Sequence, residues 1–243
     1  MSRFQFALLL TTQALWSQSE TIVFPRPLLV VAERLQAAWG RPVTYEEPRW
    51  LHGSDISMEG DPLRLNYGPR MRTAALPATA VAVRTRTSQL AALQEIVNEF
   101  NRANAPLRYD AVESKWGLHL IPVRNKDHAG ADAPAANILD FLVAVPSAPR
   151  TMDGHVGAVV TALRKQAGVA VEYGSGALGL SNARPPVFSW GTSGKMSGRE
   201  ALLSLLAPRA ATRGWRLNCM PATPGQSPEF CVLNLELPRP VRP

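Results

Sequence analysis

The chain has few residues of the kinds that hold metals or carry out redox chemistry. Its 243 residues include only two cysteines, Cys219 and Cys231, and four histidines. The cysteines do not form a CxxC motif, and no histidine has a second ligand three or four residues away, so the common zinc-binding spacings are absent. No apolar run is long enough to cross a bilayer as a helix. We therefore expect no metal, no cofactor and no membrane-spanning segment in the mature chain.

The sequence also lacks any long block of like charges. The formal net charge is +7, but the arginines are scattered along the chain rather than gathered in one run. Proteins that bind nucleic acid concentrate their basic residues on one face or in one segment. We therefore interpret the charge as solvated surface and expect no nucleic-acid partner.

The N-terminus is the segment that indicates export. Arg3 provides a short basic start, Phe4–Trp16 is mostly apolar, and Ser17 and Ser19 occupy positions −3 and −1 of a cut before Glu20. This order is typical of a secretory signal peptide. We expect residues 1–19 to be removed and the mature chain to be periplasmic or secreted; a buried first helix is the alternative.

The two cysteines are expected to form a disulfide, because oxidising compartments favour the bond. They lie in two strand-like segments joined by a loop rich in proline and glycine. If Cys219 faces Cys231 in an antiparallel pair, two further pairs of apolar residues fall on the same side of the ribbon. These pairs are Leu217 with Leu233 and Trp215 with Leu235. One register thus joins the sulfurs and forms an apolar face; two free buried thiols are the alternative.

Two parts of the sequence follow the same pattern. The phrases AAWGRPVTYE and KQAGVAVEYG align Gly40 with Gly168 and Tyr45 with Tyr173 at constant spacing. Around each phrase, apolar periodicity predicts the order β-α-β-β-α-β-β. The expected fold class is α+β: two small βαββαββ units, each a short sheet with two helices packed on one face.

The repeat also predicts the domain boundaries. The first unit is expected at residues 20–124, with an insertion at about 46–79, and the second at residues 137–238. Residues 125–136 read as a linker because they are polar and contain glycine and proline. Residues 239–243 read as a disordered tail.

The fragment GTSGK within Trp190–Glu200 invites comparison with a phosphate-binding loop. The spacing between its glycines is too short for a Walker motif, and Met196 stands where a hydroxyl residue is needed. By contrast, Ser197-Gly-Arg-Glu200 matches the S-x-x-E capping box at the start of a helix. The fragment therefore predicts a turn and a capped helix, and no nucleotide site.

The densest polar cluster lies at the start of the insertion. Its candidate partner-binding residues are Glu46, Glu47, Arg49, Trp50 and His52. Tryptophan and arginine are favoured at contact hot spots. Two carboxylates with a histidine are also the groups that acid–base chemistry or sugar binding uses. Adjacent residues at a strand end point in different directions, so we assign no catalytic residue here.

The second half resembles a known family. The run FLVAVPSAP, VGAVVTALRKQAGVAVEYG and the phrase REALLSLL at Arg199–Leu206 are similar to the short N-terminal (STN) domain of secretins and TonB-dependent transducers. The first half is similar more loosely. The resemblance implies a periplasmic domain that binds protein partners and has no catalytic residues of its own. We do not expect a pore, plug or barrel of the kind that follows this domain in the family within the 243 residues.

These observations together predict a non-enzymatic adaptor of the bacterial cell envelope with a protein partner. The expected mechanism is strand pairing at a sheet edge or docking at the insertion. An exported sugar- or peptidoglycan-binding protein or hydrolase, working from Glu46–Asp55, is the alternative. Self-association through unpaired sheet edges remains open as well.

Overall fold

We describe the fold from a computed structural model, in which the described residues are 22–24, 26–52, 56–57, 70–71, 74–76, 88–174, 185–208, 214–222 and 228–236. The expected signal peptide, most of the expected insertion and the expected tail lie outside them. No helix among the described residues has both the length and the apolar character needed to cross a membrane.

Four α-helices and one short 3-10 helix are described. They are α1 (Pro27–Trp39), α2 (Gln89–Ala103), η4 (Ile138–Asp140), α3 (Met152–Ala167) and α4 (Gly198–Leu206). The strands of the main sheet are β2 (Val43–Glu46), β6 (Arg108–Glu113), β7 (Leu118–Lys126), β8 (Asp132–Pro134), β11 (Ala170–Gly174), β14 (Gly214–Met220) and β15 (Phe230–Glu236). Short paired strands complete the fold: β1 (Ile22–Phe24) with β5 (Ala74–Leu76), β3 (Ile56–Ser57) with β4 (Arg70–Met71), β9 (Leu142–Val143) with β13 (Met196–Ser197), and β10 (Ala148–Arg150) with β12 (Phe188–Trp190).

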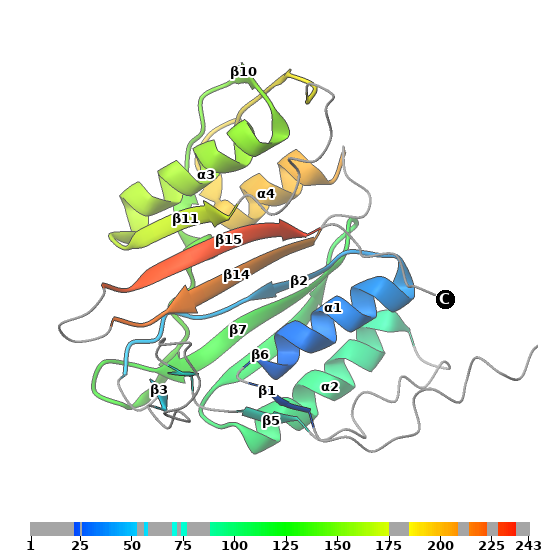
Figure 1. Ribbon diagram of the computed structural model, residues 1–243, viewed down its shortest axis with the longest axis vertical. Coiled ribbons are helices and arrows are strands. Elements are labelled where there is room, and N and C mark those ends of the chain that lie inside the picture. The colour runs from blue at the N-terminus through cyan, green and yellow to red at the C-terminus, as the bar shows by residue number, and fades with distance from the viewer. Residues whose placement is uncertain are drawn as a thin grey trace, which may run out of the picture.

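The strands of both halves of the chain form one seven-stranded sheet in the order β11-β15-β14-β2-β7-β6, with β8 also paired to β7. Within each half, the strand after the first helix runs parallel to the last strand of a hairpin: β2 to β7, and β11 to β15. The halves meet where β14 lies parallel to β2, with Arg216 opposite Tyr45 and Leu217 opposite Glu46. We call this strand pair the junction (Figure 1).

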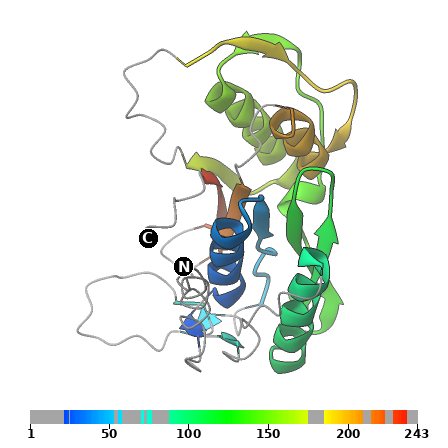
Figure 2. The same cartoon turned by 90° about the vertical axis from the view of Figure 1, so that its right-hand side faces the viewer.

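The two pairs of helices cover opposite faces of the sheet. Leu217 belongs to the core beneath α3 and α4, whereas Tyr45 belongs to the core beneath α1 and α2. Because directly opposed residues point to the same face and successive residues alternate, these two cores lie on different sides of the junction. In both views the helix pairs also lie at opposite ends of the sheet (Figures 1 and 2).

Helices together with a mixed sheet confirm the expected α+β class. The expectation of two separate short sheets differs from the structure, because β14 and β2 pair and join the strands of both halves. The division into two βαββαββ units stays a prediction. The segment expected to be a linker begins inside β7 and contains β8, which pairs with β7.

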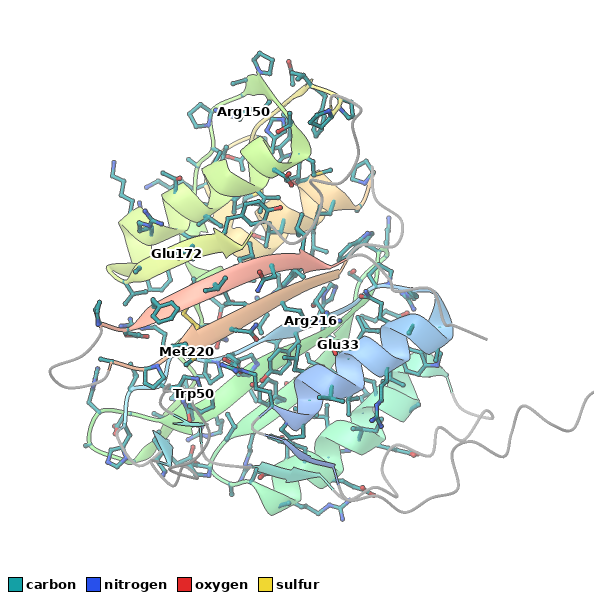
Figure 3. All side chains as sticks on the ribbon, in the orientation of Figure 1. Glu33, Trp50, Arg150, Glu172, Arg216 and Met220 are labelled. Carbon is teal, nitrogen blue, oxygen red and sulfur yellow. A yellow bond between two sulfur atoms is a disulfide. The ribbon has the colours of Figure 1, made fainter. Side chains whose placement is uncertain are left out.

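The cysteine hairpin has the predicted register. Cys219 lies opposite Cys231, Leu217 opposite Leu233 and Trp215 opposite Leu235. The two sulfurs form a disulfide with an S–S distance of 2.06 Å, and all six side chains belong to the core beneath α3 and α4. The bond is visible between β14 and β15 in Figure 3.

The capping box predicted from Ser197 and Glu200 is present. Ser197 and Glu200 form the capping box of α4, with each side chain bonded to the other residue's backbone N–H. Gly40 and Gly168 end α1 and α3 in the left-handed conformation that glycine adopts without strain. The run Ile138–Val145, which reads as a strand, instead forms η4 and the two-residue β9.

Candidate functional site

The segment Glu46–Trp50 begins with the last residue of β2 and lies at the junction. Its first two side chains are fully buried, with exposed fractions of 0% for both Glu46 and Glu47. Adjacent residues at the end of a strand point to opposite faces. The two carboxylates therefore enter different environments, as the sequence predicts, although neither reaches solvent.

Glu46 points to the face covered by α4. Arg199, in the first turn of that helix, donates two hydrogen bonds to it, from Nε to Oε1 at 2.8 Å and from Nη2 to Oε2 at 2.6 Å. The remaining Nη1 of Arg199 donates to Asp140 of η4 at 2.6 Å. A carboxylate of the first half is thus held by a two-pronged arginine contact from the second half.

Glu47 points to the other face and is held by three donors. Arg26, just before α1, donates to it through its guanidinium group. The hydroxyl group of Tyr45 donates to Oε1 at 3.2 Å, and the backbone N–H of Cys219 donates to Oε2 at 2.7 Å. Glu47 therefore connects the start of the first helix to the disulfide-bonded strand of the second half.

Burial is the largest influence on the pKa of both carboxyl groups. It raises the pKa of Glu46 and Glu47 above the ordinary value, while Arg199 and Arg26 respectively act in the lowering direction. For Arg199, burial lowers the pKa, but the hydrogen bonds and charges of Glu46 and Asp140 outweigh it, so the pKa is raised. The arginines keep their charge and partly offset the cost of burying the carboxylates.

The remaining candidate residues also contact other parts of the same chain. Arg49 donates two hydrogen bonds of 2.8 Å to Glu229, next to β15. Trp50 is half-buried and packs against the core beneath α3 and α4. His52 lies against the turn at Gly130, where an added Cβ would come within 2.8 Å of its ring. Figure 3 shows Trp50 near Met220, at the end of the sheet where the chain leaves β14.

A buried histidine adds a further contact across the junction. His119 on β7 packs with two tryptophans, Trp116 of the first half and Trp215 of β14, with ring centroids 6.2 and 5.5 Å away. The two tryptophan rings also stack on each other, with centroids 5.4 Å apart. Its Nδ1 lies 2.9 Å from the hydroxyl oxygen of Thr44, and its Nε2 lies 2.8 Å from that of Ser114. Burial, and then the charges of Arg199 and Arg41, lower the pKa of His119 to about 4.

The sequence did not indicate the arginines that complete the junction. The overall positive charge reads as solvated surface, and nothing in the sequence marks Arg26, Arg199 or Arg216 as a buried residue. Arg216 is fully buried and donates to the carbonyl oxygens of Val43 and Trp215. Its place between Trp215 and Leu217 in an alternating strand is typical of a solvent-facing residue. The sequence gives no sign that Arg216 is buried, because the helix that covers this face of β14 belongs to the other half of the chain.

No group of three or more histidine, cysteine, aspartate or glutamate side chains that could hold a metal ion occurs among the described residues. Of the candidate residues, Glu46, Glu47 and Arg49 each bind a residue of the second half. Comparison with protein-family models, curated proteins and solved structures gives no match to this chain.

Proposed function

We propose that the protein is a non-enzymatic interaction module of the bacterial cell envelope, which docks a protein partner by adding a strand to the outer edge of β6. The observation that carries the proposal is the contrast between the junction and this edge. The carboxylates at the junction are bonded internally, whereas β6 has outward-facing backbone groups that no other strand satisfies among the described residues.

The internal bonding speaks against a catalytic or sugar-binding role for the junction. A general acid or base must reach the proton that it transfers. Glu46 and Glu47 have exposed fractions of 0% and are bonded to Arg199 and Arg26. Moving either carboxylate toward a substrate would leave a buried guanidinium group without its partner, which is costly. We therefore do not propose the hydrolase or glycan-binding alternative.

The outer edges at the two ends of the main sheet differ in which of their backbone groups are bonded by side chains of a neighbouring helix. At β11, Arg164 of α3 donates two hydrogen bonds, of 3.0 and 2.7 Å, to the carbonyl oxygen of Val171. Because Val171 is thereby engaged by its own helix, this edge is less available to a further strand.

At β6 the equivalent contact covers only one end of the strand. The side-chain amide of Asn101 in α2 donates to the carbonyl oxygen of Tyr109 at 2.9 Å and accepts from its N–H at 2.8 Å. Ser114 pairs with Gly117 across the hairpin. Since backbone direction alternates along a strand, the N–H and C=O groups of Tyr109, Ala111 and Glu113 point away from β7. Among the described residues, no strand pairs with this edge.

The proposed location rests on three observations. The buried disulfide between Cys219 and Cys231 is typical of proteins from oxidising compartments. No helix that could cross a membrane occurs in the described part of the chain. The pattern of residues 1–19, and the resemblance of Phe141–Gly174 to the STN domain, point to the periplasm.

Site-specific photo-crosslinking in the native host tests the proposal. A photoreactive amino acid placed at Val112, at the centre of the open edge, is expected to capture a protein from the envelope fraction. The matched control is Val187, which is similarly exposed at 62% against 44% for Val112 but lies away from β6. The absence of any adduct at position 112, or the same adducts at both positions, would contradict the proposal.

A further inference from the structure

The outer edge of β6 has a short and well-defined set of open groups. Tyr109 is occupied by Asn101, and beyond Glu113 the chain turns back through Ser114–Gly117. Within the part of the chain that the structure describes, the backbone groups that remain open on this edge are those of Ala111 and Glu113, with Val112 between them. A partner strand that satisfies both residues needs only a short extended stretch with the same spacing.

We infer that this partner strand is β6 of a second copy of the chain, paired antiparallel about a two-fold axis at Val112. In that register Ala111 of each copy exchanges N–H···O=C bonds with Glu113 of the other. All four open groups on each side are then satisfied by the same four groups on the partner, so the edge is self-complementary. The inference rests on the proposed function, because it names the occupant of the edge that the proposed function uses.

The side chains that meet in this register are compatible. Val112, with an exposed fraction of 44%, faces its own copy at the closely spaced, non-hydrogen-bonded position. Val112 lies opposite His119 on β7, so it points to the sheet face that α1 and α2 do not cover. Asp110 faces Ser114, and Glu113 faces Ala111. No like charges lie opposite one another, and two β-branched side chains pack at the axis.

The two neighbouring two-fold registers are excluded by features of the same strand. An axis at Ala111 would require the backbone groups of Tyr109, which Asn101 already binds. An axis at Glu113 would place two glutamates directly opposite, which is unfavourable. In the inferred register, the partner chain reaches its Ser114–Gly117 turn beside Tyr109 and leaves the edge there. The hydrogen bonds of Asn101 therefore set where the pairing of the two strands ends, and they do not prevent the pairing at Ala111 and Glu113.

Disulfide trapping tests the register. A Val112→Cys variant places two sulfurs across the axis, where the Cα atoms of a non-hydrogen-bonded pair lie about 4.5 Å apart, within reach of a disulfide. We expect this variant to form a covalent dimer under mild oxidation. Asp110→Cys is the matched control on the same strand and face. In the inferred register position 110 lies opposite Ser114 of the second copy, so the two introduced cysteines are too far apart to form a disulfide. Equal cross-linking of both variants, or none by Val112→Cys, overturns the inferred register.

Charge substitution tests the association without a covalent bond. The mature chain is expected to show a dimer mass by light scattering that falls on dilution. Val112→Asp and Val112→Lys each place like charges at the axis and should weaken the dimer about tenfold or more, whereas a mixture of the two variants should restore it as a heterodimer. Val187→Asp serves as the control for a charge at an exposed valine and should leave the dimer unchanged.

The outcomes also separate this inference from the proposed function. A wild-type chain that stays monomeric at every concentration overturns the two-fold pairing. If the photoreactive residue at Val112 then still captures another protein, the proposed docking at β6 stands and only its occupant changes. If neither a second copy nor another protein is captured, both fail.

Discussion

Single residues at the junction carry charges that are buried only because each has a partner. Glu46 illustrates this dependence: it lies in the first half, its cation Arg199 lies in the second half, and both are shielded from water. Removing one member of such a pair leaves an uncompensated buried charge, whereas removing both removes the conflict. The changes in unfolding free energy caused by the two substitutions should therefore be strongly non-additive.

Arg199→Met is predicted to lower the free energy of unfolding by about 3–5 kcal/mol, because Glu46 stays buried without its cation. Adding Glu46→Gln to this variant should recover more than half of the loss. Urea denaturation of the single and double variants measures both effects. Arg124→Met is the control, since Arg124 and Asp132 form an exposed pair worth less than about 1 kcal/mol. A loss in Arg199→Met no larger than in the control would contradict the prediction.

His119 is predicted to make stability depend on pH. Its pKa of about 4 in the folded protein lies below the ordinary value of about 6.5, so the unfolded chain binds the proton more readily. Stability from this residue is complete above pH ~6.5 and is lost as the pH falls toward ~4, by at most about 3 kcal/mol.

Unfolding free energies measured across this range for the wild type and His119→Gln isolate the effect. Glu46 and Glu47, whose pKa values are raised, contribute in the opposite direction in both proteins, so the difference between the two curves reports His119. Parallel curves would show that the ring does not titrate as predicted.

At the scale of elements, the cysteine hairpin is the part that the sequence predicted most completely. Its apolar residues repeat every second position, so a single register places both the sulfurs and the core residues on one side. The same alternation gives no sign of burial on the other side of β14. Arg216 and Asn218 are polar, as solvent-facing residues would be, yet Arg216 is fully buried.

Removing the disulfide is predicted to destabilise the protein without changing the hairpin register. The bond closes a loop with a sequence separation of 12, and the double variant Cys219→Ala/Cys231→Ala should lose about 3 kcal/mol in the chain-entropy estimate. Alkylation of the denatured, unreduced protein followed by mass spectrometry should show no modified cysteine. Two alkylated cysteines would contradict the prediction.

Other elements show where local patterns are ambiguous. The apolar run Ile138–Val145 reads as a strand, yet Ile138 and Leu139 enter the core from a single turn of 3-10 helix. A short apolar run does not distinguish these structures. Similarly, Asp153 reads as the cap of α3, but Thr151 is the residue whose side chain accepts from the backbone N–H of Gly154. Asp153 instead lies inside the first turn of the helix.

At the scale of the whole molecule, the sequence predicted the content of each half but not how the halves combine. The pairing of β14 with β2 involves residues more than 170 positions apart, such as Tyr45 and Arg216. The pattern of apolar residues within a segment does not indicate a contact with such a distant segment. The candidate site shows the same limit: Glu46, Glu47 and Arg49 are near one another in the sequence, whereas their partners Arg199, Arg26 and Glu229 are remote in it.

The junction predicts that both halves unfold together. The central strands β2 and β14 are buried on both faces, and each half supplies ion-pair partners to the other. We expect a single calorimetric transition whose van't Hoff and calorimetric enthalpies agree. In the Arg199→Met variant, hydrogen exchange should become faster in α1 and α2 as well as in α3 and α4. Faster exchange confined to the second half would show that the halves are independent.

The placement of the helix pairs on opposite faces has one consequence for recognition. In a tandem protein whose halves face the same way, one flat binding surface can contact both helix pairs at once. Here α1 and α2 cover one face of the sheet and α3 and α4 cover the other, and the pairing of β14 with β2 fixes this arrangement. A molecule bound to one helix pair would therefore leave the other pair accessible from the reverse side of the sheet.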